Sequence, residues 1–359
     1  MDDYLSVIKL GDHMLSNAPK DEPDFLSAAS GTVWHGTRLY SVGDDQAVVA
    51  EHNLEWDQVQ DALRRGESRN LLGAGLVQRI IPDVLPPSGK ERSEAKPDFE
   101  ALTMVTPAHL ARITDIQVRD EAQRRFPHGF LLFAGSGGLT WGGRRRSIGV
   151  ISTLDEHGHI IGLPTKISLE GLHEHLEQNV VSGDLNIEGI CVSDDMVALA
   201  QRGNSEGGVS SLIFIHLEDV LRSLFTDLKI DRCEVNASRE YRFPELSIKQ
   251  SDQTYPVRLE FTDIDAVAGD AEDRLVFTAA AEALEGSVKG QIAGSAVGVL
   301  RWNGELIGLW PLEDASIKLE GINGDWNPAT GTIDVLLVAD ADDPDVPAPL
   351  FAARLPELQ

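Results

Sequence analysis

Short apolar runs separated by polar turns recur along the chain and predict a protein built from β-strands. Five segments begin with an acidic or hydroxyl residue followed by Gly or Ala, and each pair opens an apolar run. The five openings are Ser30-Gly31, Glu100-Ala101, Glu188-Gly189, Asp265-Ala266 and Glu320-Gly321. A second apolar run follows each opening, as in 130–133 and 335–338. Repeated sheet units that cannot bury both faces alone must stack, and stacking round a circle gives a β-propeller.

The predicted fold is therefore all-β, a single β-propeller domain of antiparallel sheets spanning residues 1–359. Five blades can be counted, and a sixth could be hidden in residues 54–97 or 225–260. A candidate strand within residues 4–10 is expected to pair with the last blade and close the ring, which would remove an exposed sheet edge. Asn303-Gly304 predicts a hairpin that joins 299–302 to 306–310.

Helical spacing of apolar residues predicts three short surface helices, within 55–65, 169–176 and 217–225. Residues 82–97, rich in Pro, Ser and charge, are expected to form a long polar loop between blades. An interdomain linker is the alternative, but the repeat resumes at once with Asp98. Glu170-Gly171 imitates the repeat opening, yet it stands too close to Glu188 to hold a blade between them, so we exclude it.

The repeated acidic residues are candidate metal ligands. In a propeller the innermost strands line the central channel, and a small residue after the acid lets neighbouring backbones approach. Carboxylates that converge there would repel one another, so either their pKa values rise or a cation compensates them. Carboxylate oxygens suit Ca²⁺ or another divalent cation, while the lack of paired His and of clustered Cys argues against zinc. The candidate ligands are Glu100, Glu188, Asp265, Glu320 and Asp263.

A structural role for the same carboxylates is an equal alternative. Each acid could accept hydrogen bonds from the N–H groups of the adjacent blade, or pair with Arg202 or with the arginines 144–146, and so hold the ring together. The sequence does not decide between the two roles.

The loops that follow the second strands are expected to emerge on one face, where ligands of rigid scaffolds commonly bind. Arginine with an adjacent amide or hydroxyl would suit a carboxylate or phosphate of a ligand. Turn formation is the alternative role for the Gly and Asn residues there. The candidate substrate-binding residues are Arg202, Asn204, Ser136, Arg144 and Asn323.

A strongly acidic composition limits the partners. The chain has 58 Asp and Glu against 31 Lys and Arg, a formal charge of -27. Such a field repels phosphate backbones and anionic membranes, so neither nucleic acid nor a membrane is expected as a partner. A small-molecule ligand or a protein remains. The two cysteines are expected to be reduced, and the absence of an apolar leader or of about 18 consecutive apolar residues favours the cytoplasm.

Several of these segments carry a family resemblance. The motifs are Lys96–Leu102, Phe133–Gly137 with its trailing arginines, Leu185–Gly189, Gln201–Asn204 and Phe261–Asp265. Together they resemble an uncharacterised bacterial β-propeller family, which implies the fold and no established activity. More distantly, the Glu-Gly openings are similar to those of the gluconolactonase and regucalcin group and of phytase-like esterase propellers, whose central acidic residues bind Ca²⁺ or another divalent ion.

Two functions follow from the sequence. One is a metal-dependent hydrolase or lactonase that acts on a small molecule, with the channel carboxylates holding the cation and Arg202 and Asn204 orienting the substrate. The other is a non-catalytic ligand- or protein-binding propeller scaffold, in which protein donors satisfy the same carboxylates.

Overall fold

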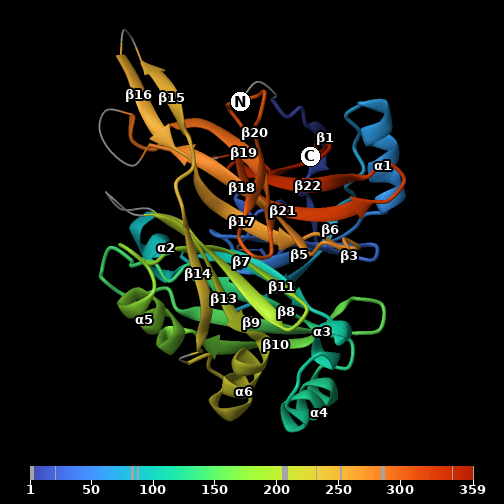
Figure 1. The fold of residues 1–359 in the computed structure, drawn as a ribbon, viewed down its shortest axis with the longest axis vertical. Coiled ribbons are helices and arrows are strands. Elements are labelled where there is room, and N and C mark those ends of the chain that lie inside the picture. The colour runs from blue at the N-terminus through green and yellow to red at the C-terminus, as the bar shows by residue number, and fades with distance from the viewer. Residues whose placement is uncertain are drawn as a thin grey trace.

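Five four- or five-stranded sheets hold most of the strands in the computed structural model (Figure 1). The structure describes residues 4–20, 22–81, 85–86, 89–203, 209–231, 233–250, 253–283, 288–341 and 343–358. Each sheet begins with one inner strand and proceeds outward, with antiparallel pairing except for a short parallel strand at the edge of the first sheet. We call these sheets blades 1 to 5 in chain order.

The blades are built from the following strands, given from the inner strand outward. Blade 1 has β3 (Ala29–His35), β4 (Arg38–Gly43), β5 (Val48–Asn53), β6 (Gly75–Arg79) and β2 (Leu15–Ser16). Blade 2 has β7 (Phe99–Val105), β8 (Phe130–Gly135), β9 (Ile148–Leu154) and β10 (Ile160–Ser168). Blade 3 has β11 (Ile187–Ser193), β12 (Met196–Gln201), β13 (Ser210–His216) and β14 (Val235–Tyr241). Blade 4 has β17 (Glu260–Ala266), β18 (Arg274–Glu282), β19 (Ile292–Arg301) and β20 (Leu306–Pro311). Blade 5 has β21 (Lys318–Asn327), β22 (Thr332–Asp340), β23 (Pro349–Arg354) and β1 (Ile8–Asp12).

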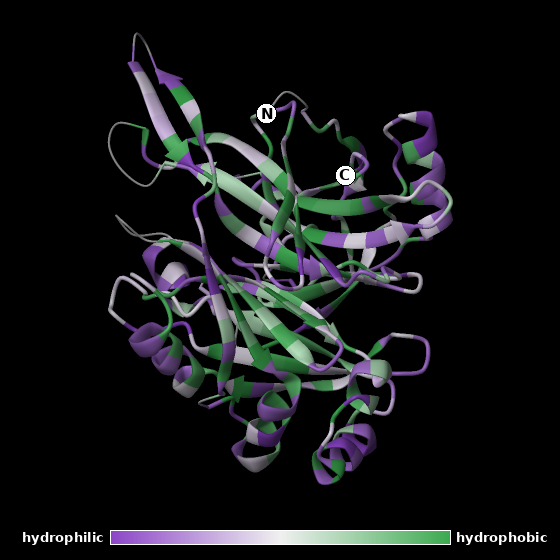
Figure 2. Cartoon of the chain, viewed as in Figure 1, coloured by the Kyte–Doolittle hydropathy of each residue, from purple (hydrophilic) through white to green (hydrophobic). Residues whose placement is uncertain are grey.

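The inner strands contact one another in a closed cyclic order: β3, β7, β11, β17, β21 and again β3. An apolar cluster fills each interface between consecutive blades. Phe133 and Val42 belong to the cluster between blades 1 and 2, while Leu336 and Leu39 belong to the one between blades 5 and 1. Figure 2 shows the blades as mainly hydrophobic strands. The predicted all-β propeller is confirmed, because stacked sheets bury on each other the faces that one sheet alone would leave exposed.

The strand near the amino terminus joins the last blade. β1 pairs antiparallel with β23, with Ile8 opposite Ala352 and Asp12 opposite Pro349. The outer edge of β23 is thereby covered, and strands from the first and last parts of the sequence share one blade. The strand begins at Ile8, later than expected, since Leu5 instead forms an isolated bridge with Leu312.

The segments that could have hidden a sixth blade have other roles among the described residues. β6 extends blade 1, and β14 extends blade 3. A two-stranded hairpin of β15 (Glu245–Gln250) and β16 (Gln253–Arg258) projects from the body (Figure 1). The stretch 82–97, predicted to be a polar loop, contains helix α2 (Gly89–Ala95) in its described part, and that part of the prediction is wrong. Helical Lys, Glu, Arg and Ala residues there explain the difference, since they favour a helix without any apolar periodicity.

The helices lie outside the sheets. The three predicted ones are α1 (Trp56–Arg65), α5 (Glu170–Asn179) and α6 (Leu217–Asp227). The sequence pattern missed α3 (Pro107–Ala111) and α4 (Ile116–Arg125). Both begin at capping residues, Thr106 and Asp115, whose side chains accept backbone N–H bonds. Glu170 lies in α5, which confirms that its resemblance to the repeat opening is accidental. In the described part of the chain no helix is long and apolar enough to cross a membrane.

Candidate functional site

The beginnings of the inner strands and the ends of the second strands meet at one end of the ring. Phe99 lies opposite Gly135, Ile187 opposite Gln201, and Lys318 opposite Asp340. The loops after the second strands therefore emerge on the same face, as predicted. We call this face the polar end, because charged and polar side chains of the described residues gather there. They are Asp44, Lys96, Asp98, Glu100, Ser136, Glu188, Arg202, Glu260, Glu282, Lys318, Glu320 and Asp340.

A β-bulge interrupts every inner strand at the same place. The pairing register shifts across one residue in each blade. The five bulge residues are Ser30, Glu100, Glu188, Thr262 and Glu320. The fourth repeat thus begins at Thr262, and its assignment to Asp265 is wrong by three positions. Backbone pairing sets the repeat, whereas Asp265-Ala266 matches the acid-small pattern farther along the same strand.

Glycine after the bulge lets neighbouring inner strands approach closely. A Cβ at Gly189 would lie 2.7 Å from the backbone nitrogen of Ile264 in the next blade. A Cβ at Gly31 would lie 2.9 Å from the Cβ of Leu102, again in the next blade. Side chains larger than hydrogen would force the inner strands apart, as the sequence pattern predicts.

Two bulge residues carry hydroxyl groups, and both bind the next blade. Ser30 Oγ donates to the carbonyl of Phe99 at 2.9 Å, and Thr262 Oγ1 donates to the carbonyl of Leu319 at 2.8 Å. Each acceptor carbonyl belongs to the residue just before the neighbour's own bulge. The hydroxyls therefore satisfy backbone groups that the bulge removes from the sheet ladder.

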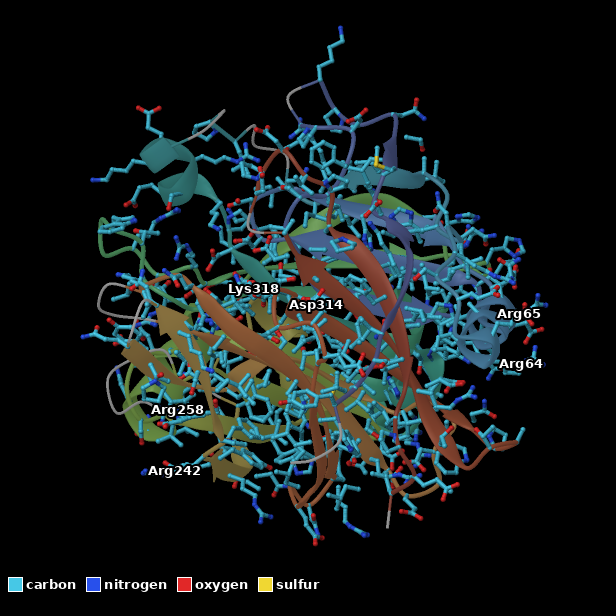
Figure 3. All side chains as sticks on the ribbon, turned by 90° about the horizontal axis from the view of Figure 1, so that it is seen from above. Arg64, Arg65, Arg242, Arg258, Asp314 and Lys318 are labelled. Carbon is cyan, nitrogen blue, oxygen red and sulfur yellow. The ribbon has the colours of Figure 1, made fainter. Side chains whose placement is uncertain are left out.

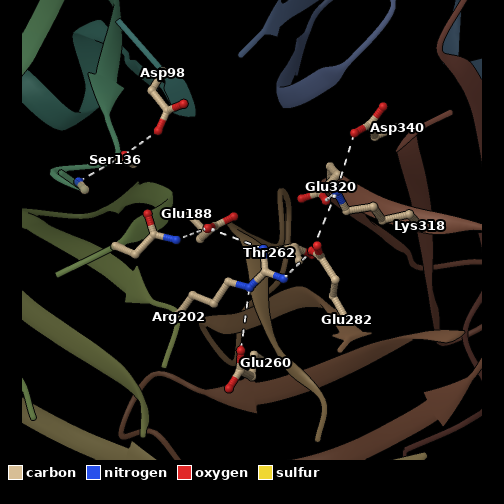
Figure 4. A network of polar contacts seen from close by, with 12 residues as sticks. Asp98, Ser136, Glu188, Arg202, Glu260, Thr262, Glu282, Lys318, Glu320 and Asp340 are labelled. Atoms are coloured by element: carbon tan, nitrogen blue, oxygen red, sulfur yellow. Dashed lines mark hydrogen bonds and ion pairs between the residues drawn. The ribbon is translucent and has the colours of Figure 1, made fainter. Parts of the chain in front are cut away.

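Arg202 forms ion pairs with three glutamates from two blades (Figure 4). Its guanidinium lies 3.0 Å from Glu282, 3.5 Å from Glu188 and 3.7 Å from Glu260, and its side chain is only 8% exposed. Burial raises the pKa of Glu188 to about 8; the Arg202 charge opposes this rise and the neighbouring Glu320 adds to it. The carboxylates hold the pKa of Arg202 above its ordinary value. Blades 3 and 4 are thus joined through one buried cation.

Lys318 continues this network toward blade 5. Its ammonium lies 3.0 Å from Glu320, 3.4 Å from Asp340 and 3.9 Å from Glu282. Glu282 therefore lies between the two cations, Arg202 and Lys318. Figure 3 shows Lys318 over the central part of the molecule.

A third group lies where blades 1 and 2 meet. The ammonium of Lys96 is 2.5 Å from Asp44, 2.9 Å from Asp45 and 3.2 Å from Asp98. Asp44, Asp98 and Glu100 each offer a carboxylate oxygen, and these three oxygens lie within 4.8 Å of one another. We call these three residues the carboxylate triad.

Burial and neighbouring negative charges raise the pKa values of two residues of the carboxylate triad. Burial raises the pKa of Asp44 to about 6, with Lys96 opposing the rise. Burial raises the pKa of Glu100 well above its ordinary value, and the charges of Asp98 and Asp44 raise it further. Ser136 Oγ donates to Asp98 at 2.6 Å and so fixes one carboxylate of the set. Asp98 also has a φ of 58°, in the left-handed region that Asp tolerates better than most residues.

The other predicted ligands, Asp263 and Asp265, join blades 4 and 5. Asp263 Oδ2 accepts a 2.9 Å bond from the N–H of Ile322, and Asp265 Oδ2 accepts a 3.2 Å bond from the N–H of Gly324. Asn323 Nδ2 donates to Asp265 and to the carbonyl of Thr32, both at 3.1 Å. These side chains follow the structural alternative considered for the repeat acids, since adjacent inner strands supply their partners.

The predicted substrate-binding residues do not form one group. Ser136 and Arg202 lie at the polar end, whereas Asn323 lies between inner strands. Arg144 is exposed and donates to the carbonyl of Glu94 at the end of α2. Asn204 lies outside the described residues.

Several residues of the polar end were not singled out from the sequence. They are Asp44, Lys96, Asp98, Glu260, Glu282, Lys318 and Asp340. Three of these, Asp44, Glu282 and Asp340, stand in the loops or strand ends after second strands, which the sequence did place on one face. Choosing the acidic residue at each such position would have found them.

Comparison with known proteins places the chain in a family. The model of a family described as "Family of unknown function (DUF6929)" matches residues 25–355. The chain belongs to this family. A search of curated proteins gave no match.

Three solved structures of similar arrangement can be compared with this member of the family. An α-L-arabinofuranosidase from Podospora anserina in complex with cellotriose is 10% identical, with 99% of this chain and 97% of that chain covered and a TM-score of 0.45. A glutaminyl cyclase from Myxococcus xanthus is 10% identical, with 98% of each chain covered and a TM-score of 0.41. The calcium-binding protein regucalcin from Agrobacterium tumefaciens is 10% identical, with 99% and 98% covered and a TM-score of 0.34.

Proposed function

We propose that the protein is a metal-dependent hydrolase, similar to propeller lactonases, that acts on a small molecule at the polar end. The observation that carries the proposal is the carboxylate triad, whose three oxygens lie within 4.8 Å of one another. Hard oxygen donors at such separations fit Ca²⁺ or a comparable divalent cation. The crowding of Asp98 and Asp44 around Glu100 supports it, because their charges add to the rise that burial causes in the pKa of Glu100, and a bound cation would relieve this repulsion.

Five residues of the polar end have a role in this proposal. Asp44, Asp98 and Glu100 would hold the cation, which when bound would polarise a substrate carbonyl or lower the pKa of a water molecule. Ser136 keeps the Asp98 carboxylate in one orientation through its 2.6 Å hydrogen bond. Glu188 is the neighbouring carboxylate whose charge also raises the pKa of Glu100. With a pKa of about 8, Glu188 can carry or accept a proton near neutral pH.

The cation is tested with protein purified without chelator. We expect bound divalent metal by elemental analysis, and a melting temperature that rises with added Ca²⁺ and falls with EDTA, because a ligand of the folded state stabilises it. Glu100→Gln should abolish the response to Ca²⁺. Glu305→Gln, which changes a half-exposed carboxylate paired with Arg301, should leave it intact. Protein without metal whose melting is insensitive to both reagents would overturn the proposal.

A specific observation favours a second function, a non-catalytic propeller that binds a small molecule or a protein. Lys96 contacts two members of the carboxylate triad, and Arg202 and Lys318 contact the other acids of the polar end. Protein cations would then take the place of a metal, and the charges would hold the blades together. For either function we retain a small molecule or a protein as the partner, rather than nucleic acid or a membrane.

A further inference from the structure

A cationic cleft lies beside the polar end. Its volume is about 530 Å³, and its charged lining comes from three parts of blade 2: the segment before β7, the turn after β8 and the region from the end of β10 to the start of α5. The charged lining residues are Lys96, Arg144, Arg145, Arg146, Lys166 and Glu170. Five cations against one acid contrast sharply with the whole chain, where 58 acids outnumber 31 Lys and Arg.

Two of the cleft's arginines, Arg145 and Arg146, already bind protein carboxylates and carbonyls. Arg145 lies 2.5 Å from Glu177 and also donates to the carbonyl of Gly137. Arg146 donates to the carbonyl of Ser93 at 3.2 Å and lies 3.6 Å from Asp98. Both arginines are therefore fixed in place, and their orientation is set before any ligand arrives.

Among the described residues, two cations of the cleft form no direct ion pair, although the charge of Arg144 does act on the nearby Glu94 carboxylate. Arg144 uses one N–H for the carbonyl of Glu94, and Lys166 is exposed near the end of β10. In the part of the chain that the structure describes, no carboxylate lies within 4 Å of the Arg144 guanidinium or of the Lys166 ammonium. The chain has a charge of -27 and many carboxylates, yet these two cations of the cleft have no direct carboxylate partner among the described residues, so they can pair with an anionic ligand.

We infer that this cleft binds a small molecule through an oxyanion, a phosphate or a carboxylate, with Arg144 and Lys166 as its principal partners. Guanidinium and ammonium groups form charge-assisted hydrogen bonds with both kinds of oxyanion. A small ligand fits better than a polyanion, because the net charge of -27 repels an extended phosphate backbone.

The position of Lys96 connects the cleft with the proposed function. Lys96 lines the cleft and also contacts Asp44 and Asp98 of the carboxylate triad. An anionic group held in the cleft would therefore place the remainder of its molecule next to the triad. The inference rests on the proposed function only for what happens to the ligand there, since no residue of the carboxylate triad lines the cleft.

Titration calorimetry with the full chain tests the inference in buffer that contains EDTA, so that the result does not depend on a bound cation. Inorganic phosphate and citrate are titrated separately at low and at high NaCl. We expect at least one of them to bind and to weaken with salt. Arg144→Gln with Lys166→Gln should lower the affinity at least about tenfold. Lys166→Gln alone, at an exposed position, should weaken it in the same direction with unchanged folding.

A charge-matched control distinguishes binding by the cleft residues from the effect of the protein's net charge on anion affinity. Arg64→Gln with Arg124→Gln removes two cations whose side chains are 66% and 69% exposed on α1 and α4; Figure 3 shows Arg64 at the edge of the molecule. This pair should change the affinity less than about twofold. Binding of phosphate alone or citrate alone supports the inference and identifies the oxyanion. Lack of binding of both anions, equal weakening by both double variants, or tighter binding of a single-stranded oligonucleotide than of phosphate would overturn it.

Discussion

The hydroxyl of Thr262 donates a 2.8 Å hydrogen bond to the carbonyl of Leu319 and joins the inner strands of blades 4 and 5. Both residues are buried. Thr262→Val keeps the shape of the side chain but leaves this carbonyl without its donor. We expect a loss of about 1–3 kcal/mol in the free energy of unfolding, measured by urea denaturation. A loss within error of zero would show that the bond does not stabilise the ring.

Gly189 tests the close approach of the inner strands. A Cβ there would lie 2.7 Å from the nitrogen of Ile264, so Gly189→Ala should destabilise the protein by about 1–3 kcal/mol. Gly73→Ala is the control, since a Cβ at Gly73 meets nothing within 4 Å, and we expect it to be neutral or slightly stabilising. Equal stability of the two variants would contradict the crowding of the inner strands.

Among the cations of the polar end, replacement of Arg202 should lower the free energy of unfolding most. Arg202→Met leaves Glu188, Glu260 and Glu282 without their shared guanidinium, and we expect a loss of about 3–5 kcal/mol at neutral pH. The loss should be smaller at pH 5, because burial raises the pKa of Glu260 and this carboxyl is then closer to its neutral form. Arg301→Gln breaks an exposed pair with Glu305 and should cost less than about 1 kcal/mol. Denaturant unfolding at both pH values measures these differences.

Stability should fall as pH rises from 6.5 to 8. The pKa of Glu188 is raised to about 8, from 4.5, so the folded state holds a proton that the unfolded state has released. The stability that Glu188 contributes is complete below pH 4.5 and is lost as pH rises through 8, at up to about 1.4 kcal/mol per pH unit. Below 6.5 the buried histidines His13 and His52, whose pKa values are lowered to about 3 and 4, act in the opposite direction.

The variant Glu188→Gln isolates this effect. It should reduce the slope of unfolding free energy against pH between 6.5 and 8 by about one proton. Glu305→Gln, at a half-exposed position, should leave the slope unchanged. An unaltered slope in Glu188→Gln would mean that Glu188 is ionised throughout this range.

A substitution of Lys96 distinguishes the two proposed functions. Its ammonium lies among Asp44, Asp45 and Asp98, where it would compete with a divalent cation. If the carboxylate triad binds Ca²⁺, Lys96→Gln should tighten that binding by about tenfold or more, measured by calorimetry. Lys249→Gln, an exposed change on the projecting hairpin, should have little effect. A scaffold would instead give a less stable Lys96→Gln variant that binds no Ca²⁺.

Much of the fold follows from local sequence. Asn303-Gly304 predicts the hairpin between β19 and β20, and apolar alternation predicts the inner strands, because turn chemistry and strand periodicity act over a few residues. Helices α3 and α4 escaped prediction, since their caps at Thr106 and Asp115 were the main signal. The start of the fourth repeat was misplaced, since register is set by pairing between strands and Thr262 does not match the acidic pattern.

Less of the candidate site than of the fold could be predicted from the sequence. Glu100 and Glu188 stand at bulges and could be recognised by their spacing. Asp44 of blade 1 offers an oxygen within 4.8 Å of one from Glu100, and the charge of Lys318 in blade 5 acts on Glu188. Only the closed ring brings these residues of different blades together. Ion pairing across blades depends on three-dimensional arrangement, which no short window of sequence contains.

The pairing of β1 with β23 has a consequence for synthesis of the chain. Ile8 meets Ala352 only after residues 9–351 between them have been made, so the fifth sheet must wait for two segments that lie far apart in the sequence. Contacts so distant in sequence are slow to form, and β23 presents an unpaired edge until they do. Nascent molecules of this protein therefore pass through an open ring, and the interval before closure is when they are most exposed to aggregation.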